Sequence, residues 1–255
     1  ARHQKQILVQ ADQLKLNDNL IKYNLPTVKL DTSNDMKYAY THGFFCGDGT
    51  TYDNYSKTVK YPKAYLYGEK KLLLNYLTYE SYSENISSDR YDLVLPKNIN
   101  EKFYVPLNQS LNTTLKWFEG YCDADGTIVR NGTNESLQIG SVEKDFLLKI
   151  KLMLQVIGID SKVTKNKDAS KRLMPDHKGG MKEYDCKEIF RLLINSNELY
   201  KLSQLGFSPK RLKFQETLLQ REAAQFIKVV GIEKLENPED TFCFTEEKRH
   251  MGMFN

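Results

Sequence analysis

The sequence lacks any long hydrophobic run. No stretch of about 18 consecutive apolar residues occurs, and the opening segment, ARHQKQILVQ, has no apolar core of a signal peptide. The first absence argues against a membrane-spanning helix, and the second argues against secretion through a cleaved leader. We therefore predict an intracellular protein without a membrane partner.

Cysteine and histidine are scarce, with four of each among 255 residues. The cysteines, Cys46, Cys122, Cys186 and Cys243, lie far apart and form no Cys-x-x-Cys pair. The usual ligand spacing of a zinc site is therefore absent. Scattered, unpaired cysteines are typical of a reducing compartment, and we expect such a compartment and no zinc site.

A strong excess of charge of one sign is also missing. Lysine and arginine number 37 against 33 aspartates and glutamates, which leaves a net charge of +4. This balance permits an anionic partner without identifying one. Basic residues do concentrate in residues 162–180 (KVTKNKDASKRLMPDHKGG) and 208–214 (SPKRLKF). Such clusters suit a surface that faces phosphates, and each taken alone suits a solvated loop equally well.

What the sequence does contain is an octet that occurs twice, as GFFCGDGT (residues 43–50) and GYCDADGT (residues 120–127). Each ends an apolar segment that predicts a helix stopping at a glycine. The aspartates before those glycines, Asp48 and Asp125, lie 77 residues apart. We interpret the spacing as one helix-hairpin-helix unit used twice.

Other segments follow the same order in both halves. In the second helix, residues 112–126, Thr113 or Thr114 is the candidate N-cap, and Gly126 is a candidate for the residue after the helix. The remaining predicted elements are strands within 50–69, a helix at 70–80, a hairpin at 127–141 around Asn131-Gly132, a helix at 143–158, a strand at 161–166, a strand or helix at 186–196, a helix at 196–207, and strands within 6–25, 226–236 and 241–246.

Small residues give the two helices a smooth face. Gly43 and Gly47 in the first, and Gly120 and Ala124 in the second, follow an i, i+4 spacing on which two backbones can approach closely. If these faces meet, the two aspartates arrive side by side, and two adjacent carboxylates do not both stay ionised without a cation. A magnesium ion bound there would make a hydrolytic centre.

The plainer interpretation is that each Asp-Gly-Thr is only a helix end with a turn, and either octet alone is weak evidence for a site. Two copies in matching contexts favour a paired site. Asp123 occurs in the second octet only, because Cys46 stands at the matching position of the first. We therefore assign Asp123 to solvent or structure.

The two octets resemble the paired motifs of LAGLIDADG homing endonucleases, as THGFFCGDG (41–49) and FEGYCDADG (118–126). The resemblance implies an α/β (α+β) fold of two αββαββα-like repeats related by a pseudo-twofold axis. Their saddle-shaped antiparallel sheets would lie along the major groove of double-stranded DNA. It also implies that Asp48 and Asp125, together with the preceding Gly47 and Ala124, hold Mg²⁺ or Mn²⁺.

The family uses a basic residue in each half near the scissile phosphate. EKFYVP offers Lys102 and SPKRLKF offers Lys210, with Lys97 and Lys213 as rivals. Further DNA contacts are expected from basic residues of the predicted strands and of the basic loop at 162–180. These are Lys57, Lys60, Arg130, Lys165, Lys167, Lys171 and Arg172.

The chain also resembles the inteins of ribonucleotide reductase large subunits, through YAYTHGFFCGDGT, KFYVP and TFCFTEEKRHMGMFN. In those inteins an endonuclease interrupts a protein-splicing (Hint) domain. His3 and His250 would then be splicing histidines, and Cys243 would stand where aspartate is common. The implied divisions are 1–36 and 219–255 for the splicing domain, 37–112 for the first LAGLIDADG half and 113–218 for the second.

Splicing requires a nucleophile at the first residue and a terminal asparagine that can cyclise. The sequence starts with Ala1, and Asn255 aligns better with an internal asparagine of the family. We therefore expect that the ends of the splicing domain are missing and that the chain does not splice by itself.

We predict a monomeric, metal-dependent enzyme that cuts both strands of a long DNA target. One alternative is a non-cleaving, maturase-like protein that binds DNA or RNA, and another is a protein-splicing element without its ends. Both aspartates are present, which favours the enzyme.

Overall fold

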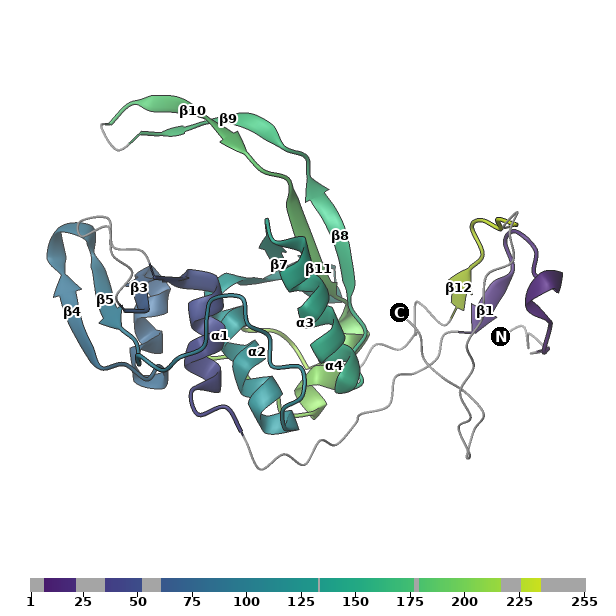
Figure 1. Ribbon diagram of the computed structural model, residues 1–255, viewed down its shortest axis with the longest axis horizontal. Helices are drawn as coiled ribbons and strands as arrows, with labels where there is room; N and C mark the ends of the chain where they lie inside the picture. The colour runs from purple at the N-terminus through teal and green to yellow at the C-terminus, as the bar shows by residue number, and fades with distance from the viewer. Residues whose placement is uncertain are drawn as a thin grey trace. The chain divides into compact units, whose positions relative to one another are not determined.

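The computed structural model of the chain describes residues 7–21, 35–51, 61–132, 134–176, 179–216 and 226–234. The chain divides into two compact units (Figure 1). The terminal unit comprises Ala1–Tyr23 with Ala223–Asn255, and the central unit comprises Asn24–Glu222. None of the helices in the described ranges is long and apolar enough to cross a membrane.

In the terminal unit the two ends of the chain pair with each other. A short 3₁₀ helix, η1 (Ala11–Gln13), precedes strand β1 (Asn19–Ile21), which pairs antiparallel with β12 (Phe226–Lys228). A turn at residues 16–17 precedes β1, with Asn17 in the left-handed region at φ 73°. The strand expected before this turn is wrong for residues 7–16, because Ala11–Gln13 closes into a helical turn instead.

The central unit contains the same order of elements twice. The first repeat consists of α1 (Ala39–Asp48), β2 (Gly49–Thr50), β3 (Lys63–Tyr67), η2 (Gly68–Tyr76), β4 (Ser81–Asn85), η3 (Ile86–Ser88) and β5 (Arg90–Val94). The second consists of α2 (Leu111–Asp125), β6 (Gly126–Asn131), β7 (Asn134–Ser141), α3 (Lys144–Val156), β8 (Lys162–Lys167), β9 (Ser170–Pro175), β10 (Met181–Cys186), β11 (Ile189–Ile194) and α4 (Ser196–Gln204).

The two four-stranded sheets have the same topology, β2-β3-β5-β4 and β6-β7-β11-β8, and all their neighbours are antiparallel. Their registers also agree. Gly49 pairs with Ala64 as Gly126 pairs with Ile139. The mixed α/β fold and its predicted internal repeat are therefore confirmed.

Two predicted helices differ in detail from the observed ones. The segment expected to be helical at 70–80 forms the 3₁₀ helix η2, which buries only Leu73, whereas its counterpart α3 buries a five-residue apolar stripe. Helix α2 begins earlier than expected. The Ser110 hydroxyl accepts from the Thr113 amide, so Ser110, and neither Thr113 nor Thr114, is the N-cap.

The strand expected at 161–166 is present as β8, and a two-stranded ribbon replaces the rest of the basic loop that was expected at 162–180. Residues 162–167 and 170–175 are strands, and β9 pairs antiparallel with β10. The ribbon is closed where the Gly180 amide donates to the Asp176 side chain, 2.6 Å away. It lies between β8 and β11 in the chain, at the point where the first repeat connects β4 to β5 directly through η3.

The core of the central unit is built around the contact between α1 and α2. Trp117, Phe118 and Tyr121 of α2 are buried with apolar residues of α3, β7 and β11. On the other side, Phe44 and Phe45 of α1 are buried with β3 and β5. Each sheet therefore covers one side of the helix pair with one face, and its other face carries no core residues.

Candidate active site

The small residues predicted to form a smooth face are the contact between α1 and α2. A β-carbon added at Gly43 would lie 1.9 Å from the carbonyl oxygen of Trp117, and one added at Gly120 would lie 1.9 Å from that of Tyr40. Further along, a β-carbon at Gly47 would lie 2.6 Å from that of Ala124. Neither Gly43 nor Gly120 can therefore carry a side chain without separating the helices.

Both helices run straight into a strand. Gly49 and Gly126 follow α1 and α2 in extended backbone, with φ −84° and −74°. Gly126 follows the helix as predicted, and it does so in extended rather than left-handed backbone. Glycine is required there for space, because a β-carbon would lie 2.4 Å from the Phe45 carbonyl oxygen at Gly49 and 2.5 Å from the Cys122 carbonyl oxygen at Gly126.

Asp48 and Asp125 are the last residues of the two helices and lie at the same end of the pair. The Asp125 carboxylate lies beside Gly47 of α1, 2.9 Å from the position that a β-carbon would take there. Although this carboxylate reaches solvent, the surrounding protein and then the negative charge of Asp48 raise the pKa of Asp125 above the usual 3.8. The two carboxylates are thus close enough to repel each other.

Three cations surround this pair. Lys70 of η2 donates from Nζ to Asp48 Oδ2 across 2.5 Å. Lys70, Lys102 and Arg211 each lower the pKa of Asp125 and so oppose the effect of Asp48. No sequence motif identifies Lys70 as a site residue, because it reaches Asp48 only when η2 folds beside the end of α1.

Lys102, the candidate basic residue of the first half, lies at the end of α1. Its ammonium group donates to the carbonyl oxygens of Gly49, at 2.5 Å, and of Gly47, at 3.3 Å. These carbonyls flank Asp48 on both sides. Lys102 therefore places its charge beside the first aspartate.

Arg211 occupies the corresponding place in the second repeat. Its guanidinium group donates to the carbonyl oxygens of Asp123 at 2.6 Å, Gly126 at 2.8 Å and Cys122 at 3.2 Å. Gly126 is the counterpart of Gly49 in the repeat. The structure therefore pairs Lys102 with Arg211, which the sequence had not singled out from the run SPKRLKF.

The other candidate lysines lie elsewhere. Lys210 donates from its ammonium group to the Ser208 carbonyl oxygen at 2.7 Å and lies 4.0 Å from the Glu119 carboxylate. Lys213 donates to the Lys210 carbonyl oxygen at 3.3 Å, and Lys97 lies over the Tyr61 ring at 4.9 Å.

Asp123 is a structural residue and is completely buried. Its carboxylate accepts from the backbone amides of Lys210 at 2.7 Å, Arg211 at 2.8 Å and Leu212 at 3.3 Å, and from the Tyr40 hydroxyl at 2.7 Å. Burial, and next the charge of Asp123, raise the pKa of Tyr40 well above its ordinary value. Asp123 therefore fixes the segment that presents Arg211.

Of the expected DNA contacts, Arg130 donates to Glu135 at 2.7 Å and to the Lys213 carbonyl oxygen at 2.9 Å. Lys165 forms an ion pair with Asp168 at 2.7 Å. Lys167 lies in β8 opposite Ile189, and Lys171 and Arg172 are neighbours in β9. Lys57, Lys60, His3, His250 and Cys243 lie outside the described residues.

Two arginines that the sequence analysis missed lie on the faces of the sheets opposite the core. Arg191 alternates with the buried Phe190 and Leu192 in β11 and donates to Gln138 Oε1 at 3.2 Å. Arg90 of β5 donates to Asp92 at 2.5 Å and lies over the Tyr65 ring at 4.4 Å. Arg191 is held in place by a neighbour on the adjacent strand β7, and Arg90 by a neighbour on its own strand. The alternation within 189–194 could have indicated the first of them.

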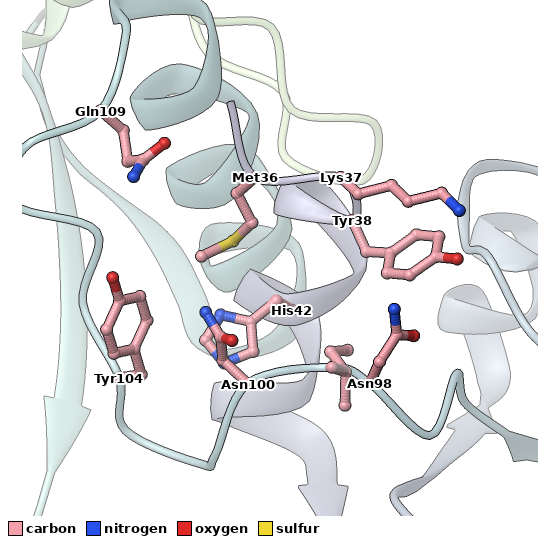
Figure 2. Close-up of a pocket in the computed structure, with 9 residues that line it drawn as sticks. Met36, Lys37, Tyr38, His42, Asn98, Asn100, Tyr104 and Gln109 are labelled. Carbon is pink, nitrogen blue, oxygen red and sulfur yellow. The ribbon is translucent and has the colours of Figure 1, made fainter. Parts of the chain in front are cut away.

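A separate cavity of about 180 Å³ lies near the beginning of α1, as Figure 2 shows. It is lined by His42, Tyr104 and Gln109 among others. His42 is buried; its Nδ1 accepts from Trp117 Nε1 at 2.8 Å, and its Nε2 donates to the Glu101 carbonyl oxygen at 3.0 Å. Asp48 lies six positions after His42 in the helix, which is ~9 Å of rise. The cavity is therefore distinct from the site of the paired aspartates.

Among the described residues, no three or more His, Cys, Asp or Glu side chains converge in a way that could hold a metal. The two aspartates therefore stand as a pair. Any ion that they hold would complete its coordination with other oxygens, such as main-chain carbonyls, water or a phosphate.

The chain is similar to part of much longer proteins. The ribonucleoside-diphosphate reductase large subunit of Invertebrate iridescent virus 6 is 46% identical over 97% of this chain, which covers 25% of that protein. The NrdEB subunit alpha of the same reductase from Bacillus subtilis (strain 168) is 24% identical over 97% of this chain, which covers 27% of it. The chain thus spans about a quarter of the length of these relatives.

Solved structures with a similar arrangement include I-DmoI in complex with DNA and Mn, with a TM-score of 0.40, 14% identity, and coverage of 67% of this chain and 95% of that one. The N-terminal LAGLIDADG domain of DUF199/WhiA gives a TM-score of 0.39 at 14% identity, covering 67% of this chain and 82% of that one. Residues 112–203, from the first turn of α2 to the last turn of α4, match the family model of a LAGLIDADG-like domain.

Proposed function

We propose that the protein is a site-specific DNA endonuclease that uses a divalent metal to hydrolyse one phosphodiester bond in each strand. The observation that carries this proposal is the placement of Asp48 and Asp125 side by side at the ends of two helices in contact. The C-terminal end of a helix carries partial negative charge, so a carboxylate there is unfavourable without a cation. Two such carboxylates form an anionic site, and the ion pair of Lys70 with Asp48 neutralises only part of its charge.

The residues present fit a hard divalent cation. Asp48 and Asp125 would hold Mg²⁺ or Mn²⁺, with the main-chain carbonyls of Gly47 and Ala124 as further candidate oxygens. Such an ion lowers the pKa of a bound water and offsets charge on the leaving oxygen. The raised pKa of Asp125 supports this fit, because a cation between the carboxylates would remove the repulsion that raises it.

Lys102 and Arg211 would act on the phosphate itself. Each is held by the carbonyl oxygens at the end of one helix and so stays close to one aspartate. A fixed cation there can bind a non-bridging phosphate oxygen and stabilise the charge that develops during cleavage. We propose Arg211, in place of Lys210, as the basic residue of the second half, because its guanidinium group matches Lys102 in position.

The faces of the two sheets opposite the core would bind the DNA. They carry polar side chains held in defined orientations, such as Arg191 on Gln138 and Arg90 on Asp92. Arg191 and Asp92 stand at matching positions of the repeat, since Leu192 and Leu93 pair with the equivalent residues Ile139 and Ala64. A positive residue in one half and a negative one in the other predict a target without twofold symmetry.

We further propose that the nuclease is of intein origin. The pairing of β1 with β12 supports this, because the two ends of the chain form one unit and the whole central unit is inserted between them. The match to about a quarter of a reductase large subunit supports it as well. The presence of both aspartates favours a cutting enzyme over a non-cleaving DNA- or RNA-binding protein of the same fold.

A plasmid assay tests the proposed function. The substrate is a supercoiled plasmid that carries the reductase coding sequence of the viral relative from which the matching segment has been removed, and the control plasmid keeps that segment. With magnesium, the protein should linearise the first plasmid and leave the control supercoiled, and EDTA should stop the reaction. A protein that shifts the plasmid fragment in a gel and never cuts it would instead be a binding protein.

A further inference from the structure

The β9–β10 ribbon extends beyond the sheet of the second repeat. Six residue pairs, from Ser170 opposite Cys186 to Pro175 opposite Met181, join its strands. At about 3.3 Å per residue this makes ~20 Å, the length of about six base pairs. Figure 1 shows the ribbon continuing from β8 and β11 and bending toward the side on which β3, β5 and β4 lie.

The register divides the ribbon into two different faces, because directly paired residues in an antiparallel ribbon point to the same side. One face carries two cations, a tyrosine and no acid: Ser170, Arg172, Met174, Lys182, Tyr184 and Cys186. The opposite face carries one cation and two acids together with apolar side chains: Lys171, Leu173, Pro175, Met181, Glu183 and Asp185. We call the first the cationic face and the second the mixed face.

The cationic face is the less exposed of the two. Arg172, Tyr184 and Cys186 are half-buried, whereas all six residues of the mixed face are exposed. Arg172 donates from Nε to the Ser170 hydroxyl at 3.2 Å, and Lys182 Nζ lies 5.9 Å from the Tyr184 ring. These contacts hold the charged groups against the ribbon at small cost in side-chain freedom.

We propose that this ribbon is an additional DNA-binding element whose cationic face binds the phosphate backbone outside the segment covered by the two four-stranded sheets. The inference rests on the proposed function only for the identity of the partner, double-stranded DNA. Arg172 and Lys182 supply charge complementary to phosphates, and Tyr184 supplies a hydroxyl donor between them. The acids of the mixed face would be repelled by DNA, which fixes the face that turns toward it.

The proposal separates two residues that are adjacent in the sequence. Arg172 binds DNA, whereas Lys171, which the sequence led us to expect among the DNA contacts, points to the other side, opposite Asp185, and makes no such contact in this proposal. It also makes DNA binding asymmetric, because among the described residues the first repeat connects the equivalent strands through the short segment 86–89. Contacts should therefore extend further along the DNA on the side of the second repeat.

The salt dependence of binding tests this proposal. Affinity for a mixed-sequence duplex several helical turns long is measured by fluorescence anisotropy over a range of salt concentrations. The variants are Arg172→Gln with Lys182→Gln, and Lys171→Gln as the matched control on the mixed face. Each lost phosphate contact flattens the slope of log affinity against log salt by about 0.9, so the double variant should flatten it by about 1.8.

The control should keep the parental slope, and all proteins should unfold at the same urea concentration. The proposal is overturned if the double variant keeps the parental slope. It is also overturned if Lys171→Gln, which removes one charge, flattens the slope by half as much as the double variant, which removes two. If the parent itself binds no DNA, the proposed function fails together with the ribbon. If the parent binds DNA and the double variant keeps the parental salt slope, the proposed function stands and the role of the ribbon in DNA binding is lost.

Discussion

Lys70 donates to Asp48 across 2.5 Å and thereby places an ammonium group beside the paired carboxylates. The two residues come from different elements, the 3₁₀ helix η2 and the end of α1. The contact neutralises part of the charge that Asp48 and Asp125 bring together. A metal ion at the carboxylates would compete with this ammonium group for Asp48.

Replacing Lys70 by Met should therefore strengthen metal binding and lower the free energy of unfolding of the metal-free protein. The competing cation disappears, while Lys102 and Arg211 alone remain to offset the repulsion between the carboxylates; the lost ion pair, which is partly exposed, costs about 1 kcal/mol or less. Calorimetric titration with Mn²⁺ should give a lower Kd, and urea unfolding in EDTA should show the loss of stability. Lys71→Met is the control, since Lys71 pairs with the exposed Asp89. Equal Mn²⁺ affinity in both variants would show that Lys70 does not compete with the metal.

Replacing Gly43 by Ala should destabilise the central unit strongly. The added methyl group would lie 1.9 Å from the Trp117 carbonyl oxygen, which belongs to the backbone and yields only if the helices separate. We expect a loss of about 2 kcal/mol or more in the free energy of unfolding. The control Gly140→Ala meets nothing closer than 3.7 Å and should change it little. Similar urea midpoints for the two variants would contradict the close packing of α1 and α2.

His42 should make the central unit less stable in mild acid. Burial lowers the pKa of His42 below its usual 6.5, so the unfolded chain takes up a proton at a pH where the folded protein does not. Stability is then complete above pH 6.5 and falls as the pH drops from 6.5 toward the folded pKa. Urea unfolding at a series of pH values should show this fall. The His42→Gln variant should be less stable than the parent at every pH. The part of the fall in stability that comes from protonation of His42 should be absent in this variant. Parallel curves for the two proteins would mean that His42 titrates alike in both states.

Arg211 and Lys210 offer a matched comparison of adjacent basic residues. Arg211→Gln should lower kcat for cleavage by about 10²-fold, because a fixed cation for the phosphate is lost. Lys210→Gln should change kcat little, since that ammonium group contacts Ser208 and Glu119. Because Arg211 also binds carbonyl oxygens at the end of α2, the urea midpoint of each variant must be measured as well. A larger loss of kcat in the Lys210 variant would return the role to Lys210.

The sequence predicted the features that depend on local spacing. The small residues at i, i+4 spacing and the aspartate at the end of each helix are visible as two octets, and the repeat distance of 77 residues predicted the matched halves. Lys70 and Arg211 were missed because they contact groups 22 and 85 residues away, and no local pattern records such contacts. The β9–β10 ribbon was missed because polar residues occur on both of its faces, so the apolar alternation that indicates a strand is absent.

The paired aspartates are the centre of the proposed active site, and replacing each by asparagine tests their role most directly. Asp48→Asn and Asp125→Asn keep the shape of the side chain and remove one negative charge, so the contact between the helices should survive and the repulsion should fall. Cleavage and binding of the target DNA are measured side by side in magnesium for the parent and both variants. We predict that both variants bind at least as tightly as the parent and make no double-strand break. Cutting at the parental rate by either variant, or joint loss of binding and folding in both, would contradict the assignment of these carboxylates to catalysis.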